Sequence, residues 1–373
     1  MPPLHTMIDS QSELDLMTEQ LGREKAIAFD IECASNLHHY INRLCLMQFA
    51  ARGSVFVVDA LKGLDLEPIG RLLEDPAIEI VMHDTDFDLR SLDRYHGWRP
   101  RNLFDTLIAA RLCGHREFGL SSLLEKHFGK RGSKRFQRAD WTVRPIPRDM
   151  LEYAAADVVC LEQLRDLLAK ELEKLGRMAW ARAKFKQCEE KRFEPDERPL
   201  FARVKNAREL CKPQELAVLN ELAVARDEIA RSLDRPLFMV MADPVLIALA
   251  KDRPRTIQEL ARHRGMHPEC RRRYAERLVA AVIKGSGAPP LKHTWTKRDE
   301  KHREGSPAVF NALRIWRTGY AKQLDVEPEL LLSTNSLRKL AAGAAIDDIL
   351  HEEAVGAWRF DEIKQAIKKV LSY

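Results

Sequence analysis

Runs of apolar residues in the first half of the chain predict strands that alternate with helices. Residues 26–34, 43–50 and 54–60 are rich in β-branched and apolar side chains and predict three strands. Arg52 and Gly53 separate the second strand from the third, which predicts an antiparallel pair. The pattern then predicts a helix, a short strand and three more helical segments, over 66–75, 79–84, 86–95, 119–128 and 148–175. This order is typical of an α/β fold, a mixed sheet with helices packed on its faces.

The second half of the chain is predicted to be wholly helical. A charged, Pro-containing stretch over 189–199 predicts a linker before it, and a second linker is expected over 285–305. Helix starts are predicted at Pro213, at Asp243-Pro244, at a capping box of Thr256 and Glu259 and at His267-Pro268, and Gly285 is expected to end the last of these helices.

Two stretches of this helical half resemble each other. Residues 226–250 align without gaps on residues 317–341, and a Leu-Asp pair stands at the same place in both. Two copies of one small helical module are therefore predicted, although unrelated amphipathic helices would also share some leucine spacing. With the two linkers, the repeat predicts two small all-α domains after the α/β domain, with boundaries at 1–200, 205–288 and 305–373.

Composition is that of a soluble globular protein, with 45% hydrophobic and 31% charged residues in a chain of 373. The net charge of +5 divides into −3 over residues 1–200 and +8 over residues 201–373. The basic half suits a phosphate backbone, although a solvated surface is the common reason for such a charge. Seven scattered cysteines without zinc spacing, no signal peptide and no apolar run of about 18 residues predict a cytoplasmic protein.

Two pairs of polar residues share a face of their predicted elements. Asp30 and Glu32 lie on the same side of strand 26–34, because side chains alternate along a strand. Tyr153 and Asp157 are four residues apart on a predicted helix and share its face. Taken singly, a surface pair and a well-packed helix with an exposed aspartate explain these two features.

A third acidic segment lies at a strand-to-helix junction, with Asp84, Asp86 and Asp88 at every second position. Helix capping explains Asp84 or Asp86 well and Asp88 less well. Together the three segments offer four carboxylates that suit Mg²⁺ or Mn²⁺. The absence of a His- or Cys-rich alternative argues against a zinc enzyme, and the absence of a GxxxxGK[ST] loop argues against an NTP-driven helicase.

The three segments resemble, in order, the motifs of the DEDD exonuclease superfamily in its tyrosine-bearing branch. FDIEC resembles the first motif with Asp30 and Glu32, HDTDFDLRSL the second with Asp88, and YAAADV the third with Tyr153 and Asp157. The stretches LMQF, FDTLIAARLCG and DWTVRP are also similar to the ribonuclease D family. The two helical segments resemble helicase-and-RNase-D C-terminal (HRDC) domains, the first more closely.

The resemblance implies a ribonuclease H-like exonuclease domain that shortens RNA from the 3′ end and releases nucleoside 5′-monophosphates with two divalent cations, Mg²⁺ or Mn²⁺. In this hypothesis Asp30, Glu32 and Asp157 hold one cation, and Asp30 contacts the second with help from Asp88. Tyr153 orients the attacking water, because a phenol with a pKa of about 10 is a poor base. The implied substrates are tRNA precursors and other small structured RNAs, and we expect a monomer without a nucleotide cofactor or a membrane partner.

Basic and aromatic residues in two places are the candidates for contact with RNA. Before the third motif they are Lys130, Arg131, Lys134, Arg135 and Arg138 for phosphates, and Phe136 and Trp141 for base stacking. In the first helical module they are Arg262, Arg264, Arg271, Arg272 and Arg273. A solvated surface is the alternative for the charges, and the core is the alternative for the two rings.

Two other functions stay open from the sequence. A DNA exonuclease would carry the same metal motifs, because contacts to the 2′-hydroxyl and not the metals choose the sugar. A non-catalytic RNA-binding adaptor would need none of the four carboxylates or the tyrosine, so their presence together argues against it.

Overall fold

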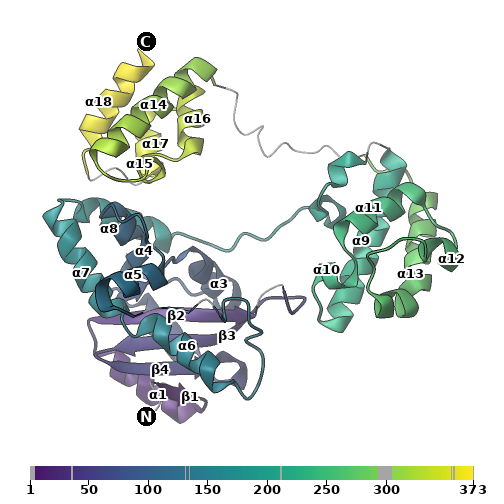
Figure 1. Cartoon of the computed structure of the whole chain (residues 1–373), viewed down its shortest axis with the longest axis horizontal. Coiled ribbons are helices and arrows are strands. Elements are labelled where there is room, and N and C mark those ends of the chain that lie inside the picture. Colours follow the sequence, from purple (N-terminus) through teal and green to yellow (C-terminus); the bar gives the residue numbers. More distant parts are fainter. Residues whose placement is uncertain are drawn as a thin grey trace. The chain divides into compact units, whose positions relative to one another are not determined.

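The computed structural model describes residues 5–34, 37–130, 132–133, 135–210, 212–292, 305–353, 355 and 358–372 (Figure 1). The chain forms two compact units. The first comprises Met1–Cys33, Leu44–Phe193 and Asp299–Tyr373, and the second comprises Ala34–Arg43 and Glu194–Arg298.

A six-stranded mixed sheet lies at the centre of the first unit, in the order β1-β4-β3-β2-β5-β6. Its strands are β1 (Thr6–Ile8), β2 (Ala26–Ala34), β3 (Arg43–Ala51), β4 (Ser54–Asp59), β5 (Glu79–Met82) and β6 (Leu103–Asp105). The predicted antiparallel pair of β3 and β4 is confirmed. Arg52 and Gly53 between them have φ of 46° and 84°, which a tight two-residue hairpin turn requires. The pairs β1–β4, β2–β5 and β5–β6 are parallel, which makes the sheet mixed.

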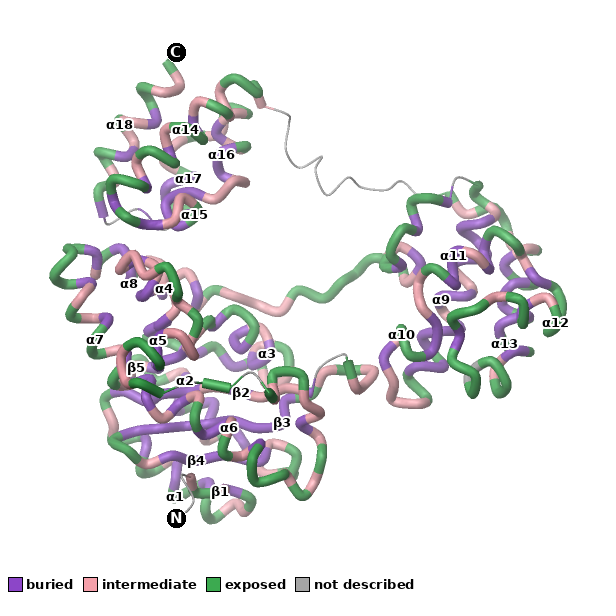
Figure 2. The backbone as a smooth tube through the Cα atoms, viewed as in Figure 1, coloured by how far each residue is buried: buried purple, intermediate pink, exposed green. Residues whose placement is uncertain are grey.

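Helices cover the sheet, and the inner strands are buried along almost their whole length (Figure 2). These helices are α1 (Gln11–Leu21), α2 (Glu67–Glu74), α3 (Asp86–His96), α4 (Thr106–Leu112), α5 (Leu120–Phe128), α6 (Arg148–Val158), α7 (Leu161–Lys174) and α8 (Met178–Glu189). The prediction of one continuous helical segment over 148–175 is wrong, because these residues form two helices, α6 and α7. Cys160 leaves the helical region between α6 and α7, with φ −113° and ψ 3°. Hydropathy cannot show this break, since the residues on both sides of it are buried in the same core.

The second unit is a helical module made of α9 (Pro213–Leu233), α10 (Leu237–Val240), α11 (Asp243–Asp252), α12 (Ile257–Leu260) and α13 (Pro268–Gly287). The predicted starts at Pro213, Asp243 and Pro268 are confirmed. The predicted end at Gly285 is wrong, because α13 continues through it. A Cβ atom on Gly285 would lie 2.5 Å from the Cα of Val218, so this glycine allows α13 and α9 to pack closely.

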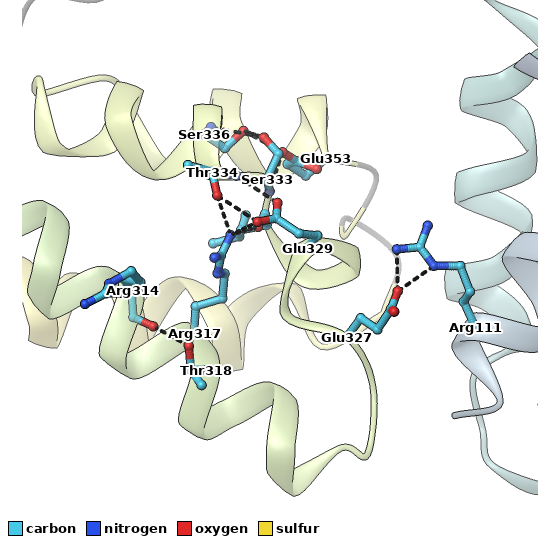
Figure 3. A network of polar contacts seen from close by, with 11 residues as sticks. Arg111, Arg314, Arg317, Thr318, Glu327, Glu329, Ser333, Thr334, Ser336 and Glu353 are labelled. Carbon is cyan, nitrogen blue, oxygen red and sulfur yellow. Dashed lines mark hydrogen bonds and ion pairs between the residues drawn. The ribbon is translucent and has the colours of Figure 1, made fainter. Parts of the chain in front are cut away.

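The C-terminal helices α14 (Pro307–Gln323), α15 (Pro328–Leu331), α16 (Thr334–Ala341), α17 (Ile346–Glu352) and α18 (Phe360–Leu371) repeat a feature of the second unit. Arg226 of α9 is buried and donates to the carbonyl of Met241 at 3.0 Å. Arg317 of α14 is buried and donates to the carbonyl of Leu332 at 2.7 Å (Figure 3). The gapless alignment pairs both arginines and both carbonyls, so the same internal contact supports the predicted repeat.

Within the first unit, the C-terminal helices pack against α4, α8 and the turn between α7 and α8. Trp180 and Trp358 stack with ring centroids 4.4 Å apart and planes 9° apart, and the Trp358 indole donates to the carbonyl of Gly176 at 2.9 Å. Arg111 of α4 and Glu327, the N-cap residue of α15, form a second contact, an ion pair of 2.5 Å (Figure 3). The stacked rings are almost fully buried, so this contact is part of a common hydrophobic core.

Candidate active site

Strand β2 and helix α6 bring three carboxylates together. Ile31 of β2 is buried in the core, so Asp30 and Glu32 on either side of it face away from the core. Tyr153 and Asp157 share one face of α6, one turn apart. One carboxylate oxygen of each of Asp30, Glu32 and Asp157 lies within 4.8 Å of the others.

Helix α3 brings a fourth carboxylate to this cluster. Thr85 is the N-cap residue of α3, and Asp88 on its first turn is 7% exposed and hydrogen-bonded to Asp30. Asp86 instead forms ion pairs with Arg90 at 3.0 Å and with Lys191 at 3.3 Å. Of these two acidic residues, Asp88 therefore belongs to the carboxylate cluster, whereas Asp86 belongs to a surface network of ion pairs.

Burial and mutual repulsion hold protons on these carboxylates. Burial raises the pKa of Asp30 to about 7, and burial with the charge of Asp30 raises the pKa of Asp157 to about 8. Burial and the neighbouring carboxylates also raise the pKa values of Glu32 and Asp88 well above the ordinary range. Positive charge among the four groups would relieve this repulsion, and an all-oxygen donor set fits hard divalent cations such as Mg²⁺ and Mn²⁺.

Tyr153 stands beside the cluster as a hydrogen-bond donor. Its hydroxyl is bonded to Asp157, and burial with the nearby carboxylates raises the pKa of Tyr153. The phenol is therefore neutral at physiological pH. Its ring lies against Phe136 and Trp141, with centroid distances of 5.7 and 6.1 Å.

A pocket of about 370 Å³ opens at the carboxylates. Asp30, Tyr153 and Asp157 form one part of its lining. The rest comes from the turn after β5, the start of α4, the start of α5, the segment before α6 and the start of α7: His83, Asp84, Leu107, Gly119, Leu120, Ser121, Ser122, Leu124, Gly132, Ser133, Gln137 and Leu161. The pocket is large enough for a small polar ligand in contact with the carboxylates.

Asp105 is a site residue that the sequence analysis missed. It is 1% exposed, and one of its carboxylate oxygens accepts from the Thr85 N–H and hydroxyl, both at 3.0 Å. Its other oxygen accepts from the N–H groups of Leu107 and Ile108, at 2.8 and 3.1 Å, and so caps α4. Asp105 therefore ties the start of α3, which carries Asp88, to the start of α4. An Asp before a helical pattern was the available signal, but it predicts only the cap.

The loop candidates for RNA contact have different surroundings. Arg131 and Lys134 lie outside the described residues. Arg135 is exposed, pairs with Asp149 at 3.1 Å and lies over the half-buried ring of Phe136. Arg138 is also exposed, whereas the Lys130 ammonium points to the Cys160 sulfur at 3.2 Å.

Trp141 is 2% exposed. The expectation that Trp141 stacks on a base is therefore wrong, because both faces of its ring lie in the core. Hydropathy could not decide this, since a tryptophan in a basic segment suits either role.

The arginine candidates of the helical module belong to the second unit. Arg262, Arg264, Arg271, Arg272 and Arg273 are all exposed. The last three are consecutive near the start of α13 and line a hollow of about 900 Å³. The rest of its lining is Ile257, Ala261, His267, Pro268, Ala275 and the two acidic residues Glu269 and Glu276. We call these five arginines the arginine surface. Among the described residues, no helix has the length and apolarity to span a membrane.

Comparison with known proteins matches the two kinds of domain. Residues 5–173 match the family model of a 3′-5′ exonuclease, and residues 215–282 match that of an HRDC domain. Ribonuclease D of Gluconacetobacter diazotrophicus is 30% identical over 347 residues, which cover 91% of this chain and 86% of that protein. Ribonuclease D of Granulibacter bethesdensis is 29% identical over 97% of this chain and 91% of that protein.

Solved structures agree with the sequence relatives. The crystal structure of Escherichia coli RNase D, described as an exoribonuclease involved in structured RNA processing, is similar with a TM-score of 0.70 and 26% identity. The match covers 99% of this chain and 98% of that one. The catalytic core of RRP6 from Trypanosoma brucei has a TM-score of 0.67 and 26% identity, over 77% of this chain and 80% of that one.

Proposed function

Because this chain belongs to the ribonuclease D family and is a 3′→5′ exoribonuclease, we propose that Asp30, Glu32, Asp88, Tyr153 and Asp157 form its active site. The observation that carries this proposal is the convergence of one strand and two helices on a single cluster of four carboxylates. These residues come from three distant segments of the chain, and Asp30, Tyr153 and Asp157 among them line a pocket.

The exonuclease family uses divalent cations, and the carboxylate cluster fits them. We propose that Asp30, Glu32 and Asp157 hold one cation and that Asp30 and Asp88 hold a second. When bound, two such cations activate a water and stabilise the attacking and leaving oxygens of phosphodiester hydrolysis. Tyr153 keeps its proton and orients the attacking water by hydrogen bonding.

For the substrate we propose the 3′ ends of structured RNAs, tRNA precursors among them. Support comes from the related E. coli enzyme, which is described as acting in structured RNA processing, and from the arginine surface of the HRDC domain. Lys130, Arg135 and Arg138 are proposed as further contacts to the RNA backbone, and Phe136, whose ring lies against Tyr153, is proposed to stack on a base. The three-domain division, a monomeric state and a cytoplasmic location stay predictions.

The active-site proposal is tested with a 5′-labelled RNA that has a 3′ overhang, incubated with Mg²⁺, Mn²⁺ or EDTA. We expect a ladder that shortens from the 3′ end with either metal and not with EDTA. Asp30→Asn and Asp157→Asn should abolish it, whereas Asp86→Asn, from the same acidic segment as Asp88, should leave it unchanged. Substantial turnover by the Asp30 or Asp157 variant would refute the assignment.

The arginine surface is tested by the salt dependence of RNA binding. Each phosphate contact on a single strand contributes about 0.7 to the slope of log K against log salt. Replacing Arg271, Arg272 and Arg273 by Glu removes three such contacts, so the magnitude of the slope should fall by about 2. The triple Lys variant keeps the charge and should keep the slope. An unchanged slope in the Glu variant would remove these residues from the RNA contact.

A further inference from the structure

His83 is the first residue after β5 and lines the pocket together with Asp30, Tyr153 and Asp157. The active-site proposal gives it no role, since it belongs neither to the carboxylate cluster nor to the basic residues. It is a half-buried imidazole with one ring edge at the pocket and the other against α4.

The hydrogen bonds of Thr106 fix which nitrogen of His83 carries the proton. The Thr106 side chain is fully buried, and its hydroxyl donates to the carbonyl of Met82 at 3.0 Å. The same hydroxyl lies 2.9 Å from Nδ1 of His83. A hydroxyl has a single proton, and that proton is used on Met82, so the Thr106 oxygen must accept from an Nδ1–H of His83.

The other ring nitrogen is then an acceptor. In the neutral ring with its proton on Nδ1, Nε2 carries a lone pair. Nε2 has no hydrogen-bond partner among the described residues. Burial lowers the pKa of His83, which favours this neutral form, although the charge of Asp105 acts in the opposite direction.

The backbone around His83 is held from the same side. Asp105, next to Thr106, accepts from the N–H groups of Asp84 and Thr85 at 3.4 and 3.0 Å. Asp84 has a φ of 62°, a left-handed conformation that few residues adopt without such support. The Asp105-Thr106 pair therefore fixes both the turn that carries His83 and the direction of its ring.

We propose that Nε2 of His83 accepts a hydrogen bond from a ribose hydroxyl of the 3′-terminal nucleotide, and so helps the enzyme to recognise that nucleotide whatever its base. This proposal rests on the proposed active site, because the pocket must hold that nucleotide. Removal of nucleotides one at a time requires recognition of a group that every nucleotide carries. The base edges differ in their donors, whereas the ribose hydroxyls are the same in all four, and the 2′-hydroxyl distinguishes RNA from DNA.

The test pairs a His83 variant with substrates that lack one hydroxyl. Asn at position 83 places an amide near the position of Nδ1, within reach of Thr106, and offers no acceptor at the position of Nε2. Single-turnover rates are measured on one RNA sequence that ends in a ribonucleotide, a 2′-deoxynucleotide or a 3′-deoxynucleotide. We expect His83→Asn to slow the ribonucleotide end by about tenfold, the effect of one hydrogen bond. The substrate that lacks the bonded hydroxyl should be cleaved at the wild-type rate for that substrate.

The comparison has a definite negative result. If His83→Asn slows all three substrates by the same factor, or slows none of them, His83 does not bind a ribose hydroxyl and the proposal is overturned. Thr106→Val, which frees the ring, should reproduce part of the loss, and Thr106→Ser should restore it. Calorimetric titration with Mn²⁺ should show equal binding by wild type and His83→Asn. A wild-type protein that trims none of the substrates would count against the proposed active site instead.

Discussion

Repulsion within the carboxylate cluster should make the metal-free protein more stable when one charge is removed. Asp30 is bonded to Asp88 and lies with Glu32 and Asp157 in one site. Asp30→Asn keeps the shape of the side chain and removes a negative charge. We therefore expect this substitution to stabilise the metal-free protein at alkaline pH while it abolishes the nuclease activity.

The magnitude follows from the pKa of Asp30. Burial raises it from the ordinary value of 3.8 to about 7 in the folded protein. A shift of about three units corresponds to about 4 kcal/mol at 1.36 kcal/mol per unit. Asp30 is only half-buried at the mouth of a pocket, so solvent screening reduces this to about 2 kcal/mol. The folded state binds the proton more tightly than the unfolded state, so this destabilisation is absent below about pH 4 and complete above about pH 7.

Thermal unfolding in EDTA measures the effect. At pH 8 the melting temperature of Asp30→Asn should exceed that of the wild type by roughly 4–8 °C, and at pH 5 the difference should shrink. Millimolar Mg²⁺ should stabilise the wild type at pH 8 and stabilise Asp30→Asn much less, because the variant has lost a ligand. Asp86→Asn is the control, since it breaks exposed ion pairs with Arg90 and Lys191 and should change stability by less than about 1 kcal/mol.

One outcome would refute this reasoning. If Asp30→Asn melts at a lower temperature than the wild type in EDTA at pH 8, the four carboxylates do not repel one another in the folded protein. The aspartate would then be stabilised by its hydrogen bonds, and the site would be neutralised by something other than a bound cation.

Four further predictions concern the active site and the packing of the C-terminal helices. Nuclease activity should rise between about pH 6 and pH 8, because protons compete with cations for Asp30 and Asp157, whose pKa values are about 7 and about 8. A pH-rate profile measured at a higher Mn²⁺ concentration should therefore move to lower pH. Tyr153→Phe should lower kcat on the order of 100-fold and leave Mn²⁺ binding, measured by calorimetry, unchanged. Asp105→Asn keeps an acceptor for the α4 cap but places an amide N–H opposite the Thr85 donors, which should loosen the start of α3 that carries Asp88. The metal concentration for half-maximal activity should then rise about 10- to 100-fold. An unchanged concentration would mean that Asp105 only caps α4. Trp358→Ala should remove its stack on Trp180 at a cost of about 3–5 kcal/mol, seen as faster proteolytic release of the C-terminal helices.

Much of the fold and of the candidate site could be predicted from the sequence, because the signals are local. Strand β2 is recognisable from its apolar run, and its alternation places Asp30 and Glu32 on one face. The spacing of four does the same for Tyr153 and Asp157 on α6.

The helical repeat was also visible in the sequence. The matched aspartates of the two Leu-Asp pairs, Asp234 and Asp325, both end a helical segment with left-handed backbone, at φ of 46° and 49°. A left-handed residue at a helix end is favoured by only a few residue types, so the position of the Leu-Asp pair indicates where the helical segment ends in both copies.

The remaining features depend on residues that are distant in the chain. Three aspartates stand at every second position after β5, and only the tertiary structure decides that Asp88 meets Asp30 while Asp86 pairs with Lys191. Gly285 has the sequence appearance of a helix end and serves instead as the close contact of α13 with α9.

The same holds for buried polar and aromatic groups. Asp105 and Thr106 have the sequence of an ordinary helix start, but hydrogen-bond partners of both come from the end of β5 and the turn after it. Trp141 lies in a basic segment and belongs to the core. The sequence by itself determined the elements, their order and the chemical identity of the active-site groups, since propensity and periodicity act over a few residues. The tertiary structure decided which carboxylate joins the cluster and which hydrogen bonds orient His83, because these depend on packing between segments that the chain order does not bring together.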